Sequence, residues 1–261
     1  MASAPQKPQL PIFYQDLMPL NTRDHLNFRS RMSDSAPWLA KQHAIPLTAD
    51  EFIQAARHYP IVFSSGENPL PLALMGLNEG VNTFFDDDGK LIEQVYVPAY
   101  IRRYPFILAK LSNENDNLSL CFDPTSDSIG EFEEGERLFN DDGSTTDQTK
   151  SALEFCEKFE EAGLRTKMLT DELQKHDLLM EGEVAIQRNE APDKPYIYKG
   201  FRMIDLDKFK KLDGETLVRW SNDGILPIIY AQITSLELMR HIFGRQEQQG
   251  KMPSGDQKPA A

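Results

Sequence analysis

Short strand-like runs fill the first half of this chain, and helical patterns fill the second half. Four runs rich in β-branched, aromatic and other apolar side chains lie at residues 61–63, 70–77, 107–111 and 118–122. This composition favours β-strands. From residue 145 to residue 243, apolar side chains recur mainly at helical spacing. Strands in one block and helices in another are typical of an α+β fold, so we expect an antiparallel sheet from residues 60–123 with the helices of residues 145–243 packed on it.

Two local signals predict elements in the first half. Thr48 and Glu51 form a capping box, in which each side chain satisfies a backbone donor, so we expect a short helix to begin there. Residues 86–89, with the sequence DDDG, predict a turn because Asp and Gly tolerate positive φ. We therefore expect a hairpin between strands at residues 81–85 and 91–97.

The second half contains a further capping box and a series of shorter patterns. Thr145 and Gln148 predict the start of a helix, and Gly163 predicts its end. The remaining elements are expected as a helix at residues 168–180, strands at 182–187 and 196–203 joined by a turn at 192–195, short helices at about 205–212 and 214–222, and a last helix at 225–243 capped by Gly244.

We expect one compact domain over residues 12–244, between two flexible tails. Residues 1–11 contain three prolines and few large side chains, and residues 245–261 lack periodicity. With 15 Phe, 8 Tyr and 2 Trp, the chain has enough large apolar side chains to bury a sizeable core.

The charge of the chain argues against nucleic acid as a partner. Its 28 basic and 41 acidic residues give a net charge of −13, and residues 123–161 alone contain 13 acidic and three basic residues. Sequence-independent binding to nucleic acid depends on Lys and Arg, so we expect no nucleic-acid partner. The N-terminus lacks the regions of a signal peptide, and no apolar run reaches the roughly 18 residues of a membrane span. We expect a cytoplasmic location and leave association with the cell envelope open.

The sequence lacks the patterns of the most easily recognised enzymes. It contains no G-x-S-x-G elbow, no P-loop and no G-x-G-x-x-G, and its five His form none of the usual metal-binding spacings. Cys121 and Cys156 lie in apolar patterns without a CxxC, which fits reduced thiols. We therefore expect no metal, no cofactor and, on balance, no catalysis.

Residues 96–106, with the sequence YVPAYIRRYPF, are the most distinctive block of the chain. Arg102 and Arg103 stand between two aromatic and proline units, and guanidinium groups match carboxylates and phosphates. The alternative is that each arginine forms a structural salt bridge. His58 ends a predicted helix and is either a titratable site residue or a core residue. The candidate ligand- or partner-binding residues are His58, Tyr59, Tyr96, Tyr100, Arg102, Arg103 and Tyr104.

Residues 58–63, 74–77, 82–89 and 96–106, in this order, resemble the signature core of the SapC-like bacterial family. Short blocks between residues 200 and 236 agree, and the resemblance covers about residues 12–243. It implies no accepted reaction. The family name comes from association with a bacterial surface layer, and members tend to occur in proteobacteria near genes for flavin-dependent tryptophan halogenases and outer-membrane receptors.

These observations predict a non-catalytic accessory or binding protein that recognises a protein partner or a small ligand through residues 96–106. One alternative is an enzyme or small-ligand protein acting beside a flavin-dependent tryptophan halogenase, with His58, Tyr59, Arg102 and Arg103 around one pocket. A second alternative is a structural surface-layer component. Homo-oligomerisation and association with halogenase-type enzymes or envelope proteins are left open.

Overall fold

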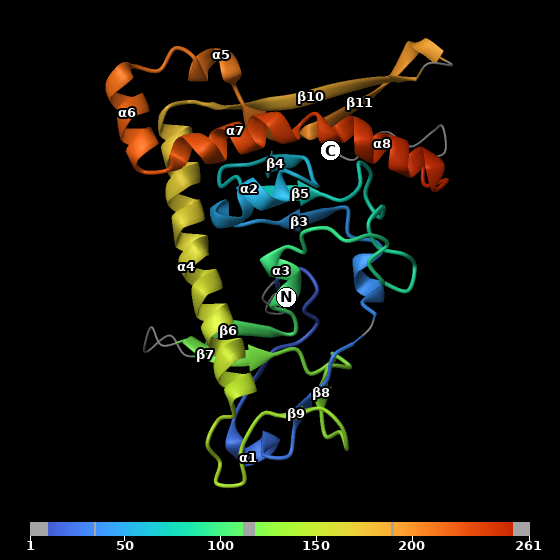
Figure 1. Ribbon diagram of the computed structural model, residues 1–261, viewed down its shortest axis with the longest axis vertical. Helices are drawn as coiled ribbons and strands as arrows, with labels where there is room; N and C mark the ends of the chain where they lie inside the picture. The colour runs from blue at the N-terminus through green and yellow to red at the C-terminus, as the bar shows by residue number, and fades with distance from the viewer. Residues whose placement is uncertain (1–9, 34, 112–117, 189–190, 253–261) are drawn as a thin grey trace, which may run out of the picture. The chain divides into compact units, whose positions relative to one another are not determined.

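The computed structural model describes residues 10–33, 35–111, 118–188 and 191–252, and the chain forms two compact units (Figure 1). Unit 1 is built from the described parts of residues 1–34 and 103–160. Unit 2 is built from those of residues 35–102 and 161–261. Antiparallel sheets lie mostly in the N-terminal half and helices mostly in the C-terminal half, which confirms the predicted α+β class. The single domain expected over residues 12–244 stays a prediction.

Unit 1 contains two small antiparallel sheets. The first has the order β1 (Met18–Pro19), β7 (Leu118–Phe122), β6 (Phe106–Lys110), and the second has the order β8 (Ile129–Gly130), β2 (Arg29–Ser30), β9 (Glu136–Arg137). A short helix, α1 (Thr22–His25), follows β1. The strands expected near residues 107–111 and 118–122 are confirmed, and their expected turn at 112–117 lies outside the described residues. Phe106, Phe122, Leu138 and Cys156 form one buried cluster.

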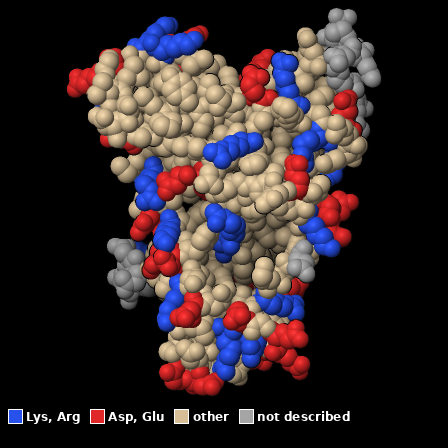
Figure 2. Space-filling model, viewed as in Figure 1, with Lys and Arg blue, Asp and Glu red and all other residues tan. Residues whose placement is uncertain are grey.

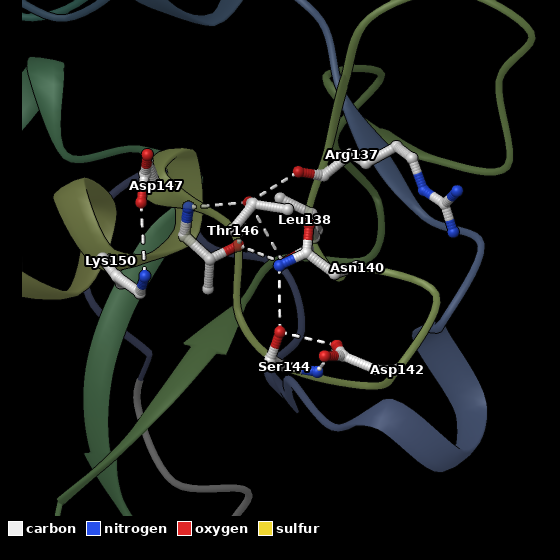
Figure 3. Close-up of polar contacts among 9 residues, drawn as sticks. Arg137, Leu138, Asn140, Asp142, Ser144, Thr146, Asp147 and Lys150 are labelled. Carbon is white, nitrogen blue, oxygen red and sulfur yellow. Dashed lines mark hydrogen bonds and ion pairs between the residues drawn. The ribbon is translucent and has the colours of Figure 1, made fainter.

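The long helix α4 (Asp147–Lys175) begins after a turn that is held by side chains. Thr146 Oγ1 donates to the carbonyl of Arg137 at 2.7 Å and accepts from the amide of Thr149 at 3.4 Å. In the preceding turn, Asn140 Nδ2 donates to Ser144 Oγ at 2.9 Å (Figure 3). Thr146, and not the predicted Thr145, therefore provides the side chain that accepts from an amide in the first turn of the helix.

Two predicted helices are one helix in the structure. α4 continues through Gly163, where we expected an end, and it also covers most of the helix expected at residues 168–180. The prediction of an end was wrong because buried residues continue at helical spacing on both sides, at Ala162, Thr166, Leu169 and Leu173. Tertiary packing overrides the weak helix propensity of one glycine. Residues up to 160 of α4 belong to unit 1, and those from 161 belong to unit 2.

Unit 2 contains a five-stranded antiparallel sheet with the order β10 (Leu179–Arg188), β11 (Ala191–Ile204), β4 (Ile61–Ser64), β5 (Pro71–Leu74), β3 (Ala44–Pro46). In Figure 1 the β10–β11 hairpin extends well past the three shorter strands. The expected strand pair is confirmed, but the turn expected at residues 192–195 is wrong, because these residues lie within β11.

The strands expected at residues 81–85 and 91–97 are also wrong, although the turn expected at residues 86–89 forms, with the amide of Gly89 donating to the carbonyl of Asp86 at 3.0 Å. Phe85 and Leu91 form one isolated bridge, and neither of the two segments, both fully described, is a strand. Asn82 is fully buried, and its side chain donates to the carbonyls of Leu39 and Gln42 and accepts from the amide of Phe84. In this segment, hydrogen bonds of the Asn82 side chain take the place of the backbone hydrogen bonds that would join two strands.

Short helices fill the connections of unit 2. They are the 3₁₀ helices η1 (Pro37–Leu39) and η2 (Ala49–Glu51) and the α-helices α2 (Phe52–Ala55), α3 (Ala99–Arg102), α5 (Leu206–Phe209), α6 (Gly214–Asn222), α7 (Ile225–Ser235) and α8 (Leu238–Gln248). The capping box of Thr48 and Glu51 is present, and the two short helices predicted at residues 205–222 are confirmed.

The C-terminal helix predicted at residues 225–243 is two helices. Thr234 Oγ1 and Ser235 Oγ donate back to helix carbonyls, and such bonds weaken the backbone ladder where α7 ends. Gly244, expected to cap the helix, lies inside α8. A flexible tail was expected from residue 245, but Gln246 is fully buried. Its side-chain oxygen accepts from the amide of Leu77 at 2.6 Å.

Candidate functional site

Tyr59 and Tyr96, two of the predicted site residues, belong to a buried hydrogen-bond network. Tyr59 is fully buried, and its hydroxyl donates to the carbonyl of Tyr96 at 2.7 Å. The Tyr96 hydroxyl donates to Glu51 Oε1 at 2.9 Å, and the amide of Ala99 donates to the same oxygen at 2.7 Å. Burial and the Glu51 carboxylate raise the pKa of Tyr96 to about 12. Both phenols therefore stay protonated at neutral pH and act as structural donors.

Arg102 and Arg103 have different environments and belong to different units. Arg102 is exposed, and its Nε donates to the carbonyl of Val97 at 3.0 Å. Arg103 is only 6% exposed, lies 4.2 Å from the ring centroid of Phe159, and forms an ion pair with Glu160 at 3.6 Å. Arg103 thus has a structural environment, and Arg102 is the accessible arginine of the pair.

The other predicted residues do not converge on a cavity. Tyr100 is buried in α3, and His58 is half-buried, with its ring 6.0 Å from that of Tyr59. Tyr104 belongs to unit 1, where its ring packs edge-on against Tyr14, 5.3 Å between centroids. None of the seven predicted residues lines either of the two cavities described below.

The five-stranded sheet of unit 2 has two different faces. Residues directly opposite in an antiparallel pair share a face, and alternate residues of a strand share one as well. One face therefore carries Ile45, Ile61, Phe63 and Ala73, all fully buried. The other face carries Ala44, Val62, Ser64, Leu72, Leu74 and Phe201.

A cavity of about 320 Å³ opens on this second face, and all six of its residues line it. Leu77 and Met239 add further apolar wall, and the polar lining comes from His43, Ser65, Glu79, Tyr198 and Lys199. We call this cavity the sheet pocket. Small-molecule sites are typically concave, mostly apolar and about 300–1,000 Å³, with a few polar groups, so the sheet pocket is at the lower end of that range.

A β-bulge turns Tyr198 into the sheet pocket. Between the pairs Gly182–Phe201 and Val184–Tyr198, β11 contains one residue more than β10. In a regular strand, residues three apart such as Tyr198 and Phe201 would point to opposite faces, and the extra residue places them on the same face. Gly200, in the bulge, has a φ of 89°, a conformation that favours glycine.

The hydroxyl of Tyr198 has no hydrogen-bond partner in the part of the chain that the structure describes. The residue is only 4% exposed, and the hydroxyl oxygen itself is buried. An unsatisfied buried polar group destabilises a fold by roughly 1–3 kcal/mol. Burial also raises the pKa of Tyr198, so the group remains a neutral hydroxyl that can donate and accept.

The titratable side chains that line the sheet pocket include His43, Glu79 and Lys199. Burial lowers the pKa of His43, while the Glu79 carboxylate raises it by a smaller amount. Lys199 Nζ is paired with Glu183 Oε2 at 2.7 Å. The serines are bonded to backbone: Ser64 Oγ accepts from the amide of Leu70. The sheet pocket therefore combines neutral polar groups with two exposed charged side chains, Glu79 and Lys199.

A second cavity, of about 570 Å³, is also lined by residues of the loop at 76–82 and shares Glu79 with the sheet pocket. Its lining includes Lys41, Glu79, Asp87 and Lys251. Lys251 Nζ donates to the carbonyl of Asn82 at 2.7 Å, so this lysine already has a hydrogen-bond partner in the loop. The second cavity contains no buried polar side chain that both lacks a partner and is described.

Among the described residues, no three His, Cys, Asp or Glu side chains lie close enough to hold a metal ion. None of the described helices combines the length and the apolar character needed to cross a membrane. On the face shown in Figure 2, Lys and Arg are interspersed with Asp and Glu.

Tyr198 and His43, which line the sheet pocket, are not among the seven site residues predicted from the sequence. One signal for Tyr198 was present, because Gly200 interrupts a predicted strand, and an isolated glycine in a strand often marks a bulge. No comparable signal marks His43, which reaches the sheet pocket only through the pairing of β3 with β5.

The comparisons with known proteins gave one match. A family model described as SapC matches residues 20–242. No curated protein and no solved structure matches the chain at a significant level.

Proposed function

This chain belongs to the SapC family, and we propose that it is a non-catalytic binding protein that holds a small molecule in the sheet pocket. The observation that carries the proposal is the sheet pocket itself, a mostly apolar cavity of about 320 Å³ with a few polar side chains in its lining.

The bulge supports the same proposal. A regular β11 would turn Tyr198 away from the second face of the sheet, and the chain uses Gly200 to avoid this. Bulges of this kind are frequent next to binding and catalytic sites, where they redirect one side chain.

The sheet pocket contains no residue of the block 96–106, which the sequence predicted as the binding surface. Most of the distinctive side chains there are engaged in packing, as Tyr96 is with Glu51 and Arg103 with Phe159. Arg102 is bonded to the Val97 carbonyl and the Tyr96 hydroxyl but is exposed, and a protein partner that contacts it would form a second, separate interaction. The enzyme alternative, which needs His58, Tyr59 and both arginines around one pocket, gains no support from the lining of either cavity.

The experiment recovers the tagged protein from the cells that produce it and identifies the small molecules retained, by mass spectrometry. Three forms are compared: the wild type, Ala44→Phe, which fills the sheet pocket, and Ala185→Phe, a matched change at an exposed position of β10. We expect one molecule with the wild type and Ala185→Phe, and its loss with Ala44→Phe at an unchanged melting temperature. No retained molecule, or equal retention by all three forms, would contradict the proposed function.

A further inference from the structure

Three arginines of unit 1 lie on one face of the small sheet β8–β2–β9. Arg29 of β2 is directly opposite Gly130 of β8 and Arg137 of β9, and directly opposite residues point to the same face. The ring of Phe132 also lies on this face, 3.1 Å from the position that a Cβ on Gly130 would take. The guanidinium of Arg31 lies 4.0 Å from the centroid of that ring. We call the surface formed by Arg29, Arg31 and Arg137 the arginine face.

Two of these arginines have no carboxylate partner among the described residues. Arg29 Nη1 and Arg31 Nε each donate to a backbone carbonyl at 2.8 Å, which leaves both positive charges unneutralised by direct contact. Arg137 is paired with Asp141 at 2.7 Å, but the side chain of this aspartate is 90% exposed. Like charges directly opposite each other destabilise a sheet, so an anion bound between Arg29 and Arg137 would relieve their repulsion.

We propose that the arginine face binds an acidic peptide segment of a partner protein. Guanidinium groups match carboxylates in geometry as well as in charge, since each can donate two parallel hydrogen bonds. Arg29 and Arg31 are two residues apart in an extended segment, because the amide of Arg31 continues the pairing with β8. Their Cα atoms are therefore about 6–7 Å apart. Carboxylates on alternate residues of an extended peptide repeat at the same distance, so one segment can contact both arginines.

The open form of the arginine face favours a peptide over a single small anion. Arg31 is exposed, the other two arginines are half-buried, and none of the three lines either of the cavities described above. Figure 2 shows Lys and Arg side chains gathered over the part of unit 1 that contains β8 and β9. One exposed ion pair contributes little, but a segment with several carboxylates contacts the arginines together, and each contact raises the effective concentration for the next.

The net charge of −13 does not prevent this interaction. At physiological ionic strength, exposed charges more than about 8 Å apart are largely screened from each other. A peptide on the arginine face is therefore attracted chiefly by the charges of that face.

The experiment measures the binding of two labelled eight-residue peptides to the full chain by fluorescence anisotropy. One peptide alternates Glu and Ser, and the other alternates Gln and Ser. We expect the Glu peptide to bind and the Gln peptide not to bind. Raising the salt concentration from about 0.05 to 0.3 M should weaken the binding, because exposed charges are screened.

Variants assign the binding to the arginine face. Arg29→Gln and Arg31→Gln should each weaken the affinity for the Glu peptide by about two- to fivefold, since each removes one exposed ion pair. Arg31→Lys keeps the charge and should keep most of the affinity. Arg57→Gln, a matched change at an exposed arginine of unit 2, should leave it unchanged. Melting temperatures verify that the variants fold, and NMR shifts of the wild type should change at residues 29–31 and 129–137, which locates the site without a variant.

Three results would overturn the proposal. The first is that neither peptide binds to the wild type. The second is that Arg57→Gln weakens binding as much as Arg31→Gln, which would indicate attraction by any exposed arginine. The third is that inorganic phosphate binds more tightly than the Glu peptide, which would make the arginine face a site for small anions. The arginine face belongs to unit 1 and the sheet pocket to unit 2, so these results are independent of the proposed function.

Discussion

Replacing Arg103 by alanine is expected to lower the free energy of unfolding by about 2–4 kcal/mol, whereas Arg102→Ala is expected to lower it by less than about 1 kcal/mol. The two arginines are neighbours in the sequence and have the same side chain. The difference between the two variants therefore measures the environment that the fold gives each of them.

The magnitude follows from the contacts of Arg103. Its guanidinium lies 4.2 Å from the ring centroid of Phe159, and a desolvated cation–π contact contributes roughly 1–2 kcal/mol. The ion pair with Glu160, at 3.6 Å, adds less than about 1 kcal/mol because the carboxylate side chain is 45% exposed. The buried stem adds about 1–2 kcal/mol of lost packing. Arg102 is exposed, so its bonds to the carbonyl of Val97 and the hydroxyl of Tyr96 contribute little to stability.

The assay is urea unfolding followed by circular dichroism, with the slope of the transition compared among the wild type and the two variants. We expect a clear decrease in the midpoint for Arg103→Ala and a small one for Arg102→Ala. Equal midpoints for the two variants would refute the structural role of Arg103. Such a result would return both arginines to the list of candidate binding residues.

Two further predictions concern stability. The hydrogen bond from Arg219 lowers the pKa of Glu172 from 4.5 to about 2, so its contribution to stability is complete above pH 4.5 and is lost as the pH falls toward 2. Urea midpoints measured across this range should therefore fall more steeply for the wild type than for Glu172→Gln, and parallel curves would count against the assignment. A Cβ at Gly76 would lie 1.9 Å from the carbonyl oxygen of Val81, so Gly76→Ala should be strongly destabilising. Gly163→Ala, in open space within α4, should raise stability by about 0.5–1 kcal/mol, and thermal melts that rank these two variants the other way would contradict the packing described.

Local signals in the sequence predicted the elements that depend on local contacts. The capping box of Thr48 and Glu51 is an example, since its residues are three apart and their bonds form within one turn. The sequence could not predict that Glu51 also binds Tyr96 and Ala99, which are 45 and 48 residues away. The bonds of Glu51 to Tyr96 and Ala99 therefore follow from the tertiary fold and not from the capping motif.

The site was harder to predict because a distinctive sequence block need not be an accessible surface. The tyrosines and arginines of residues 96–106 suggested recognition, yet Tyr100 and Arg103 are buried. Tyr198 carries no distinctive motif, and it reaches the sheet pocket through a one-residue change of register. Register depends on strand pairing, which a single sequence specifies only weakly where the strands are irregular.

The order of strands in unit 2 has a consequence for synthesis of the chain. β3, β5 and β4 are made early, but β11, which pairs with β4, is not complete until residue 204. During the intervening translation, the nascent chain presents β4 as an open edge, and open edges promote association with other chains. Ribosome-bound chains stopped at residue 175 should therefore depend on chaperones, whereas chains extended beyond residue 204 can protect the edge themselves.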